Sequence, residues 1–154
     1  MRRLAVLGAV TALAAGCGGP HTPAVPTAAL LTGVHVDGSS ATFEFRTAPA
    51  TVRTHVRLRS QIAESGSGRK VPLRGNAFVV VSFSPAATAE ADENGVTFSY
   101  NGPKRLRPAV EGPVQETAKI GDFEAQLDWA IGLDHRRPVV VTRDGATVTV
   151  SFGP

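Results

Sequence analysis

Apolar and polar residues alternate with a period of two along most of the chain. In SATFEFR, residues 40–46, the side chains of Ala41, Phe43 and Phe45 fall on one face and polar side chains fall on the other. Successive side chains of a β-strand point to opposite faces, so this alternation predicts a half-buried strand. AFVVVSF, residues 77–83, is apolar on both faces, as expected for a strand that lies between two layers.

Two further segments combine an apolar stripe with a charged one. In residues 52–60, Val52, Val56 and Leu58 are expected to point inward. Residues 123–133 are expected to form a single strand with five inward-facing apolar residues. These are Ala125, Leu127, Trp129, Ile131 and Leu133. Both segments fit strands that face a core on one side and water on the other.

Residues 138–152 predict a β-hairpin. Two alternating runs flank Asp144-Gly145, and an Asp-Gly pair favours the tight turn between antiparallel strands. Along the whole chain the pattern indicates about seven or eight short strands separated by turns rich in Gly and Pro. We therefore predict an all-β fold, either an antiparallel β-sandwich or a closed barrel.

Helical signal is confined to residues 84–93. Ser84 would cap the N-terminus of a helix, and Pro85 would occupy its first position, where a missing N–H is tolerated. The fold should therefore contain at most one short helical turn, near residues 85–92.

The N-terminal segment has the layout of a secretory signal peptide. Two arginines precede an apolar run over residues 4–15, and small residues follow. The apolar run is too short to span a bilayer, which needs about 20 residues. The ending Leu13-Ala14-Ala15-Gly16-Cys17 resembles the lipobox of bacterial lipoproteins, in which the cysteine is diacylated and becomes the first residue of the mature protein. The alternative is an ordinary signal peptide followed by an unrelated cysteine.

Composition agrees with export and membrane anchoring. Cys17 is the only cysteine, so no disulfide can form within the chain, and lipidation would give this thiol a use. Residues 18–29 carry Gly, Pro and Thr without a periodic pattern, as a tether does. We therefore expect a lipoprotein signal peptide over residues 1–16, a lipidated Cys17 and tether over residues 17–29, and a folded domain over residues 30–154.

The formal net charge does not indicate nucleic-acid binding. The full chain carries +3, and removal of Arg2 and Arg3 with the signal peptide leaves +3 − 2 = +1. A nearly neutral domain has no general attraction for a polyanion such as DNA or RNA.

The charged stretch GDFEAQLDWAIGLDHRRP, residues 121–138, is the strongest candidate for chemistry. On a strand, Glu124 and Asp128 would share a face about 13 Å apart, beyond the roughly 6.5–9.5 Å that separates the carboxyl groups of inverting glycosidases. Solvated side chains opposite a buried stripe explain these acids better. Trp129 on the inward face is interpreted as a core residue.

No catalytic or metal constellation follows from the remaining polar residues. Asp134 and His135 are adjacent, so in an extended chain their side chains should point apart rather than form a catalytic pair. No G-x-S-x-G motif occurs. The four histidines, His21, His35, His55 and His135, lack the spacing of metal ligands. We predict no catalytic residue, no metal and no cofactor.

The basic face of residues 52–60 is the candidate binding surface. Arg53, His55, Arg57 and Arg59 alternate along one side of the predicted strand, about 6.6 Å apart. Such a row could bind a polyanion such as lipid head groups, wall phosphates or glycan carboxylates. Alternatively, the charges protect an edge strand from pairing with other chains, or acids such as Glu44 neutralise them. Other basic residues could add to the surface if they converge on it. These are Lys104, Arg105, Arg107, Arg136 and Arg137.

Three blocks in the folded part resemble the AMIN-like domain of actinobacterial secreted proteins and lipoproteins. The first is Gly66-Ser67-Gly68-Arg69 leading into Val71-Pro72-Leu73-Arg74-Gly75-Asn76-Ala77-Phe78, and the second is Tyr100-Asn101-Gly102-Pro103-Lys104-Arg105-Leu106. The third is Gly121-Asp122-Phe123-Glu124 with Trp129, Gly132-Leu133 and Arg137-Pro138. The early strand departs from the family's usual pattern, because Ser39-Ser40-Ala41-Thr42 stands where an Asp-Arg-type pair is common.

The resemblance implies a β-sandwich related to AMIN domains, which localise cell-wall amidases and are linked to peptidoglycan binding. It implies no catalytic residues. The leading hypothesis is therefore a non-enzymatic protein that is lipid-anchored on the extracytoplasmic face of the cell membrane and binds cell-wall glycan or peptidoglycan. The alternative hypothesis is a protein-interaction subunit that assists a membrane or envelope complex.

Overall fold

The computed structural model describes residues 27–153. The predicted signal peptide, Cys17 and His21 lie outside the described residues. The first strand begins at Ala29.

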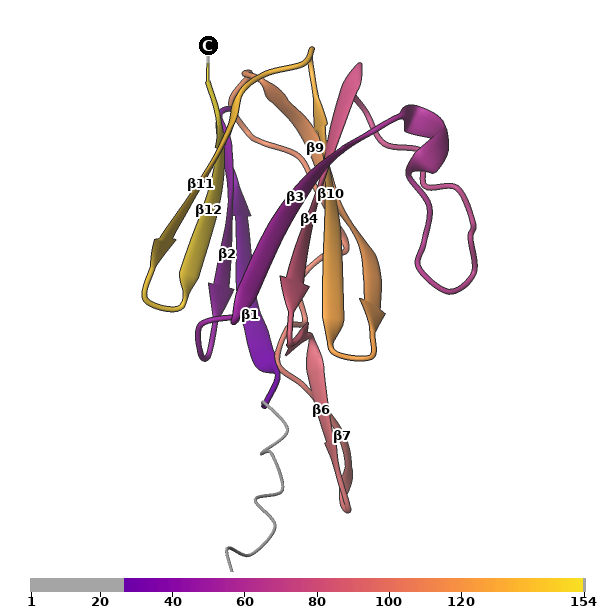
Figure 1. Ribbon diagram of the computed structural model, residues 1–154, viewed down its shortest axis with the longest axis vertical. Helices are drawn as coiled ribbons and strands as arrows, with labels where there is room; N and C mark the ends of the chain where they lie inside the picture. Colours follow the sequence, from indigo (N-terminus) through magenta and orange to yellow (C-terminus); the bar gives the residue numbers. More distant parts are fainter. Residues whose placement is uncertain (1–26, 154) are drawn as a thin grey trace, which may run out of the picture.

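Two five-stranded sheets pack face to face (Figure 1). One sheet has the order β11 (Val139–Asp144), β12 (Thr147–Phe152), β2 (Ser40–Phe45), β1 (Ala29–Val36) and β5 (Ala86–Ala87). The other has the order β3 (Thr51–Arg57), β4 (Ala77–Ser84), β10 (Gln126–Leu133), β9 (Val114–Phe123) and β8 (Arg105–Leu106). All neighbouring pairs are antiparallel except β1 and β5. The open edges make this a β-sandwich rather than a closed barrel, which confirms the all-β prediction.

The core lies between the sheets and is rich in aromatic residues. The side chain of Trp129 is fully buried, with its ring centroid 5.7 Å from that of Phe43 and 5.9 Å from that of Tyr100. The ring centroids of Phe83 and Phe43 lie 4.9 Å apart. These tilted and edge-on contacts are the arrangements that aromatic quadrupoles favour. The structure confirms Trp129 as a core residue.

A second, smaller apolar cluster covers the outer face of the β3–β4–β10–β9–β8 sheet. Ile62 and Leu73, from the long connection between β3 and β4, pack over Phe78, Val80 and Ala130. The central strands β4 and β10 are therefore covered on both faces. This explains why residues 77–83 are apolar without alternation.

The segment over residues 84–93 is extended, so the predicted helical turn near residues 85–92 was wrong. It forms β5 and then β6 (Ala89–Asp92), which pairs with β7 (Gly95–Phe98) as a projecting hairpin. Glu93-Asn94 forms the two-residue loop. The Asn94 N–H donates to Asp92 Oδ1 at 2.8 Å, and Gly95, the first residue of β7, has a φ of 128°. The helical element that does form among residues 27–153 is a single 3₁₀ turn, η1 (Arg59–Gln61).

Residues 123–133 are not one strand. β9 ends at Phe123, a two-residue turn follows, and β10 begins at Gln126. Glu124 and Ala125 both adopt left-handed φ angles, 49° and 56°, as a type I′ hairpin turn requires. Neither residue is the glycine or asparagine that marks such a turn, so the alternation continued through it without a visible break. From Leu127 onward the inward stripe is as predicted.

The β11–β12 hairpin is confirmed, with Gly145-Ala146 as its two-residue loop and Asp144 paired with Thr147. Gly145 has a φ of 56°, which a residue without a Cβ adopts easily.

Candidate functional site

Three of the four residues of the basic row predicted on residues 52–60 lie on one face of β3. Arg53, His55 and Arg57 are exposed and lie opposite Ser82, Val80 and Phe78 of β4. Since paired residues share a face, this basic row lies on the outer side of its sheet, away from the core. Within residues 27–153 the three side chains make no hydrogen bond or ion pair, and β3 is an edge strand.

Arg59 does not belong to this row. The strand ends at Arg57, and Arg59 begins η1, so its side chain turns back over the domain. Its guanidinium donates to the carbonyl oxygens of Leu73, at 2.9 Å, and Gly75, and lies 4.8 Å from the ring centroid of Phe78. Arg59 therefore holds the β3–β4 connection in place, and period-two alternation failed because the chain leaves the strand.

Val56 and Leu58, which were expected to point into the core, are exposed. Val56 is 55% exposed and Leu58 is 70% exposed, because β3 is an edge strand that runs on toward η1 beyond the cover of the facing sheet (Figure 1). Glu44 does not neutralise the basic row, since it lies on β2 in the other sheet and contacts His35 at 3.5 Å.

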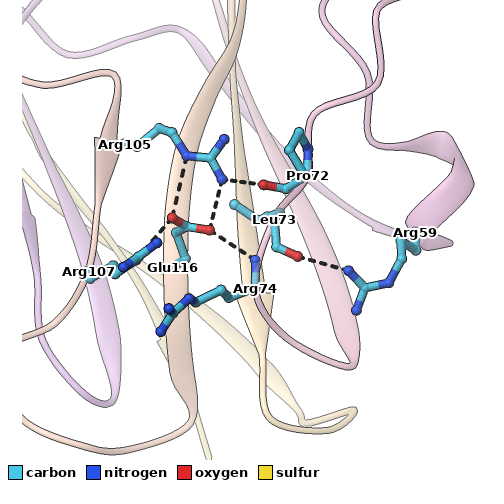
Figure 2. A network of polar contacts seen from close by, with 7 residues as sticks. All are labelled: Arg59, Pro72, Leu73, Arg74, Arg105, Arg107 and Glu116. Atoms are coloured by element: carbon cyan, nitrogen blue, oxygen red, sulfur yellow. Dashed lines mark hydrogen bonds and ion pairs between the residues drawn. The ribbon is translucent and has the colours of Figure 1, made fainter.

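A buried carboxylate at Glu116 forms a second polar site, which sequence reasoning missed (Figure 2). The side chain is 2% exposed and lies 2.9 Å from Arg105 Nη2 and 3.2 Å from Arg107 Nε. It also accepts the backbone N–H of Arg74 at 2.9 Å. Arg105 donates in addition to the carbonyl oxygen of Pro72. The network therefore joins β8, β9 and the segment before β4.

Burial alone would raise the pKa of Glu116, but the hydrogen bonds from Arg105, the Arg74 N–H and Arg107 outweigh it. The pKa therefore lies below the ordinary value of 4.5, and the carboxylate is charged at neutral pH.

An open groove of about 560 Å³ lies beside this network. Arg74, Arg107 and Glu111 line it, together with the ion-paired Asp134 and Arg137. The Arg74 side chain has no polar partner within residues 27–153, and Arg107 uses only its Nε on Glu116. The groove therefore presents two guanidinium groups with free donors. Of the other basic residues, Arg107 and Arg137 line this groove, whereas Lys104 and Arg136 do not.

Asp134 and His135 lie closer together than expected. His135 Nδ1 is 3.2 Å from Asp134 Oδ2, so the prediction that these side chains point apart was wrong. Asp134, however, binds Arg137 through both oxygens, at 2.9 and 2.8 Å, and accepts the His135 backbone N–H at 2.7 Å. The Arg137 hydrogen bond is the main reason that the pKa of Asp134 lies well below its usual range. His135 is exposed, whereas Asp134 and Arg137 are partly buried, and Arg137 also donates to the carbonyl oxygen of Gly153. This arrangement braces the turn after β10.

Asp128 is buried rather than solvated, with 7% of its surface exposed. Its carboxylate accepts Gln126 Nε2 at 3.0 Å and Ser65 Oγ at 3.4 Å. Glu124 lies in the turn rather than on the strand, so the predicted common face of Glu124 and Asp128 does not exist. The loop carrying Ser65 covers this part of β10, which the strand pattern alone could not reveal.

The sequence pattern did not predict the Glu116 network or the burial of Asp128, because each joins segments that are separate along the chain. Arg74, Arg105 and Glu116 come from separate segments, and the first two stand within the blocks that resemble the AMIN-like family. Among residues 27–153 no cluster of three His, Cys, Asp or Glu side chains could hold a metal ion. Over the same residues, no helix has the length and apolar character needed to cross a membrane.

The described residues thus form a two-layer β-sandwich that carries charged groups on its surface. The chain belongs to the AMIN-like domain family, whose model matches residues 28–150 and so covers every strand from β1 into β12. No curated protein and no solved structure matches the chain.

Proposed function

We propose that this protein is a non-catalytic binding module of the bacterial cell envelope and that its ligand is cell-wall glycan or peptidoglycan. The observation that carries the proposal is the AMIN-like match over residues 28–150, because domains of this kind are linked to binding in the envelope.

Two surfaces support an anionic wall polymer as the ligand. Within residues 27–153, the side chains of Arg53, His55 and Arg57 form no ion pair, and neither does the side chain of Arg74 in the groove. Peptide carboxylates or wall phosphates would supply the missing acceptors, since guanidinium groups bind both in bidentate geometry.

A pull-down on purified cell-wall sacculi tests wall binding. The full chain carrying Cys17→Ser should be retained at low salt and released as salt screens the arginines. Arg53→Gln with Arg57→Gln should weaken retention about threefold to tenfold, the effect of losing two exposed ion pairs. Arg136→Gln is the matched control, because Arg136 is exposed but lies outside the row and the groove. Retention no higher than that of an unrelated β-sandwich would refute the proposal.

We further propose a lipid anchor at Cys17, with the signal peptide over residues 1–16, the tether over residues 17–29 and the domain over residues 30–154. The support is the lipobox-like sequence, and β1 begins at Ala29, within one residue of the proposed boundary between tether and domain. Cells expressing Cys17→Ser should release the protein from the membrane fraction, because two acyl chains supply stable binding. Persistence of this variant in washed membranes would contradict the anchor.

The alternative, an accessory subunit of an envelope complex, rests on the open edge of β3. Val56 and Leu58 are exposed beside an unpaired strand edge, where a partner strand could add to the sheet. Crosslinking in cells from a photoreactive residue at Leu58 separates the two functions: one dominant protein product favours the subunit.

A further inference from the structure

A hollow of about 400 Å³ lies between the β6–β7 hairpin and the β9–β10 turn, apart from the basic row and the arginine groove. Two phenylalanines line it, Phe98 from β7 and Phe123 from the end of β9. Phe98 is 59% exposed and Phe123 is 67% exposed. Two large aromatic side chains are thus exposed to solvent at one hollow. Exposed apolar patches of this kind mark binding sites.

The two rings are not part of the core and do not stack on each other. Every close aromatic pair among residues 27–153 lies between the sheets, around Phe43, Phe83 and Trp129. Phe98 and Phe123 instead both line the hollow. A flat ligand with an apolar face could therefore contact either ring.

The hollow also contains a built polar network. Lys119 Nζ lies 2.9 Å from Asp122 Oδ2 and 3.0 Å from Thr88 Oγ1, and the Thr88 hydroxyl donates to Asp122. Thr88 is 3% exposed, so these groups are fixed in place by the fold. After these contacts, Lys119 keeps one N–H to donate and Asp122 Oδ1 keeps acceptor capacity.

Opposite charges balance around the hollow. Lys104 and Lys119 supply two positive charges, and Asp122 and Glu124 supply two negative ones. A site of this kind offers both donors and acceptors but no net attraction for a charged ligand. This distinguishes it from the arginine groove, which favours an anion.

The turn beside Phe123 is held in a costly conformation. Glu124 and Ala125 occupy the left-handed region without being glycine, and the Ala125 carbonyl oxygen accepts the N–H of Ala86 at 2.8 Å. Strain of this kind persists only where surrounding contacts enforce it, and it is common at ligand sites. Here it sets the positions of Phe123 and Glu124 at the rim.

A sugar ring matches all of these features. Its C–H faces are apolar and stack on aromatic rings, while the hydroxyl and amide groups at its edge need both donors and acceptors. A bilayer surface matches less well, because Asp92 and Glu93 at the nearby hairpin tip would be repelled by anionic lipids.

We propose that Phe98 and Phe123 border a site for an uncharged sugar ring, with Lys119 and Asp122 bonding its polar groups. The proposal rests on the proposed wall-binding function and adds a site for the neutral part of the ligand.

Calorimetric titration with a β-1,4-linked N-acetylglucosamine tetramer tests this site in the full chain carrying Cys17→Ser. Phe98→Ala and Phe123→Ala should each weaken binding about tenfold, because each removes one stacking surface. Phe123→Tyr should retain binding. Val140→Ala is the matched control, since Val140 is 54% exposed on β11 in the other sheet. Unchanged melting temperatures establish that the variants fold.

Two further measurements separate the possible failures. If the protein binds sacculi but neither binds the tetramer nor depends on Phe98 and Phe123, the sugar site is refuted while wall binding stands. If the phenylalanine variants instead lose binding to vesicles of phosphatidylglycerol and phosphatidylethanolamine, the hollow is a membrane contact and the sugar site is again refuted. Absence of binding to both sacculi and tetramer would refute both proposals.

Discussion

Glu116 shows how one buried carboxylate can join segments that are distant in sequence. Desolvating a carboxylate is costly, and here two arginines and a backbone N–H offset that cost. Arg105 and Arg107 are about half exposed. Water can therefore solvate both guanidinium groups when the carboxylate is removed. The backbone N–H of Arg74 would be left without its acceptor.

Glu116→Ala should therefore lower the free energy of unfolding by about 2 kcal/mol, a combination of the lost ion pairs and the orphaned N–H. Urea denaturation at neutral pH measures this. Glu111→Gln, an exposed change at the rim of the adjacent groove, should stay within about 0.5 kcal/mol of the wild type. Equal effects of the two substitutions would show that the network does not stabilise the fold.

The same carboxylate predicts how stability depends on pH. The pKa of Glu116 in the folded state is below its ordinary value of 4.5, so its stabilising contribution is complete above that value. The contribution is lost as the pH falls through the folded-state pKa. Unfolding curves measured from pH 7 down to about pH 3 should show this loss. Glu116→Gln should reduce the loss of unfolding free energy between pH 7 and about pH 3. If the variant loses as much stability as the wild type over this range, Glu116 does not contribute to the pH dependence.

Ala125 is a second residue whose local geometry predicts a measurable effect. A left-handed residue with a Cβ costs about 1–2 kcal/mol, and glycine avoids this cost but loses more entropy on folding. Ala125→Gly should therefore raise the free energy of unfolding by about 0.5–1 kcal/mol. Ala146→Gly, in a hairpin loop without a left-handed alanine, should lower it. Thermal melts of both variants measure the difference.

At the scale of elements, the connection between β3 and β4 is what turns a bare sheet face into a site. It covers the outer face with Ile62 and Leu73, brings the Arg74 N–H to Glu116, and is held by Arg59. Its close approach to β10 depends on Gly132, where a Cβ would overlap the carbonyl oxygen of Arg74.

Gly132→Ala should therefore displace this connection and lower the free energy of unfolding by about 1–3 kcal/mol, the range for overpacking a well-packed site. The melting temperature reports the loss. Gly153→Ala is the control, because a Cβ there would meet Pro138 only at ordinary contact distances, the nearest at 3.9 Å. A wild-type melting temperature for Gly132→Ala would mean that the connection moves freely.

At the scale of the whole molecule, the arginine groove and the hollow beside Phe123 lie at opposite ends of the sandwich. β9 runs from Val114, beside the arginine groove, to Phe123 at the hollow, and ten residues of strand span roughly 30 Å. Figure 1 shows the β9–β10 turn and the β6–β7 hairpin at the end where β1 begins, with the C-terminus at the other end. One extended polymer could occupy both sites at once.

Substitutions at the two sites should act independently on sacculus binding. Arg74→Gln and Phe123→Ala are far apart and share no partner, so their effects on the binding free energy should add in the double variant to within about 0.5 kcal/mol. Measuring retention of the two single variants and the double variant completes the cycle. A double variant no weaker than Phe123→Ala alone would show that the groove does not bind the wall.

The predictable part of this fold came from local rules. Alternation located β2, β3, β4, β10 and the β11–β12 hairpin, because the period of side chains in a strand is independent of what the strand packs against. It failed at Glu124-Ala125, where a tight turn lacks glycine, and at residues 84–93, where the capping pattern at Ser84 predicted a helical turn but the chain forms β5 and β6. In both places antiparallel pairing between consecutive strands, β9 with β10 and β6 with β7, overrode the local preference.

The amino-acid sequence by itself determined the all-β class, the burial of Trp129, the resemblance to the AMIN-like family and the basic row on β3. These depend on periodicity and on the order of motifs along the chain. Three further features depend on the three-dimensional fold: Arg59 leaves the row, Glu116 is buried among arginines, and Phe98 and Phe123 line one hollow. Each of these depends on contacts between residues 9 to 42 positions apart, and such contacts depend on how the strands pair and which loops cover them.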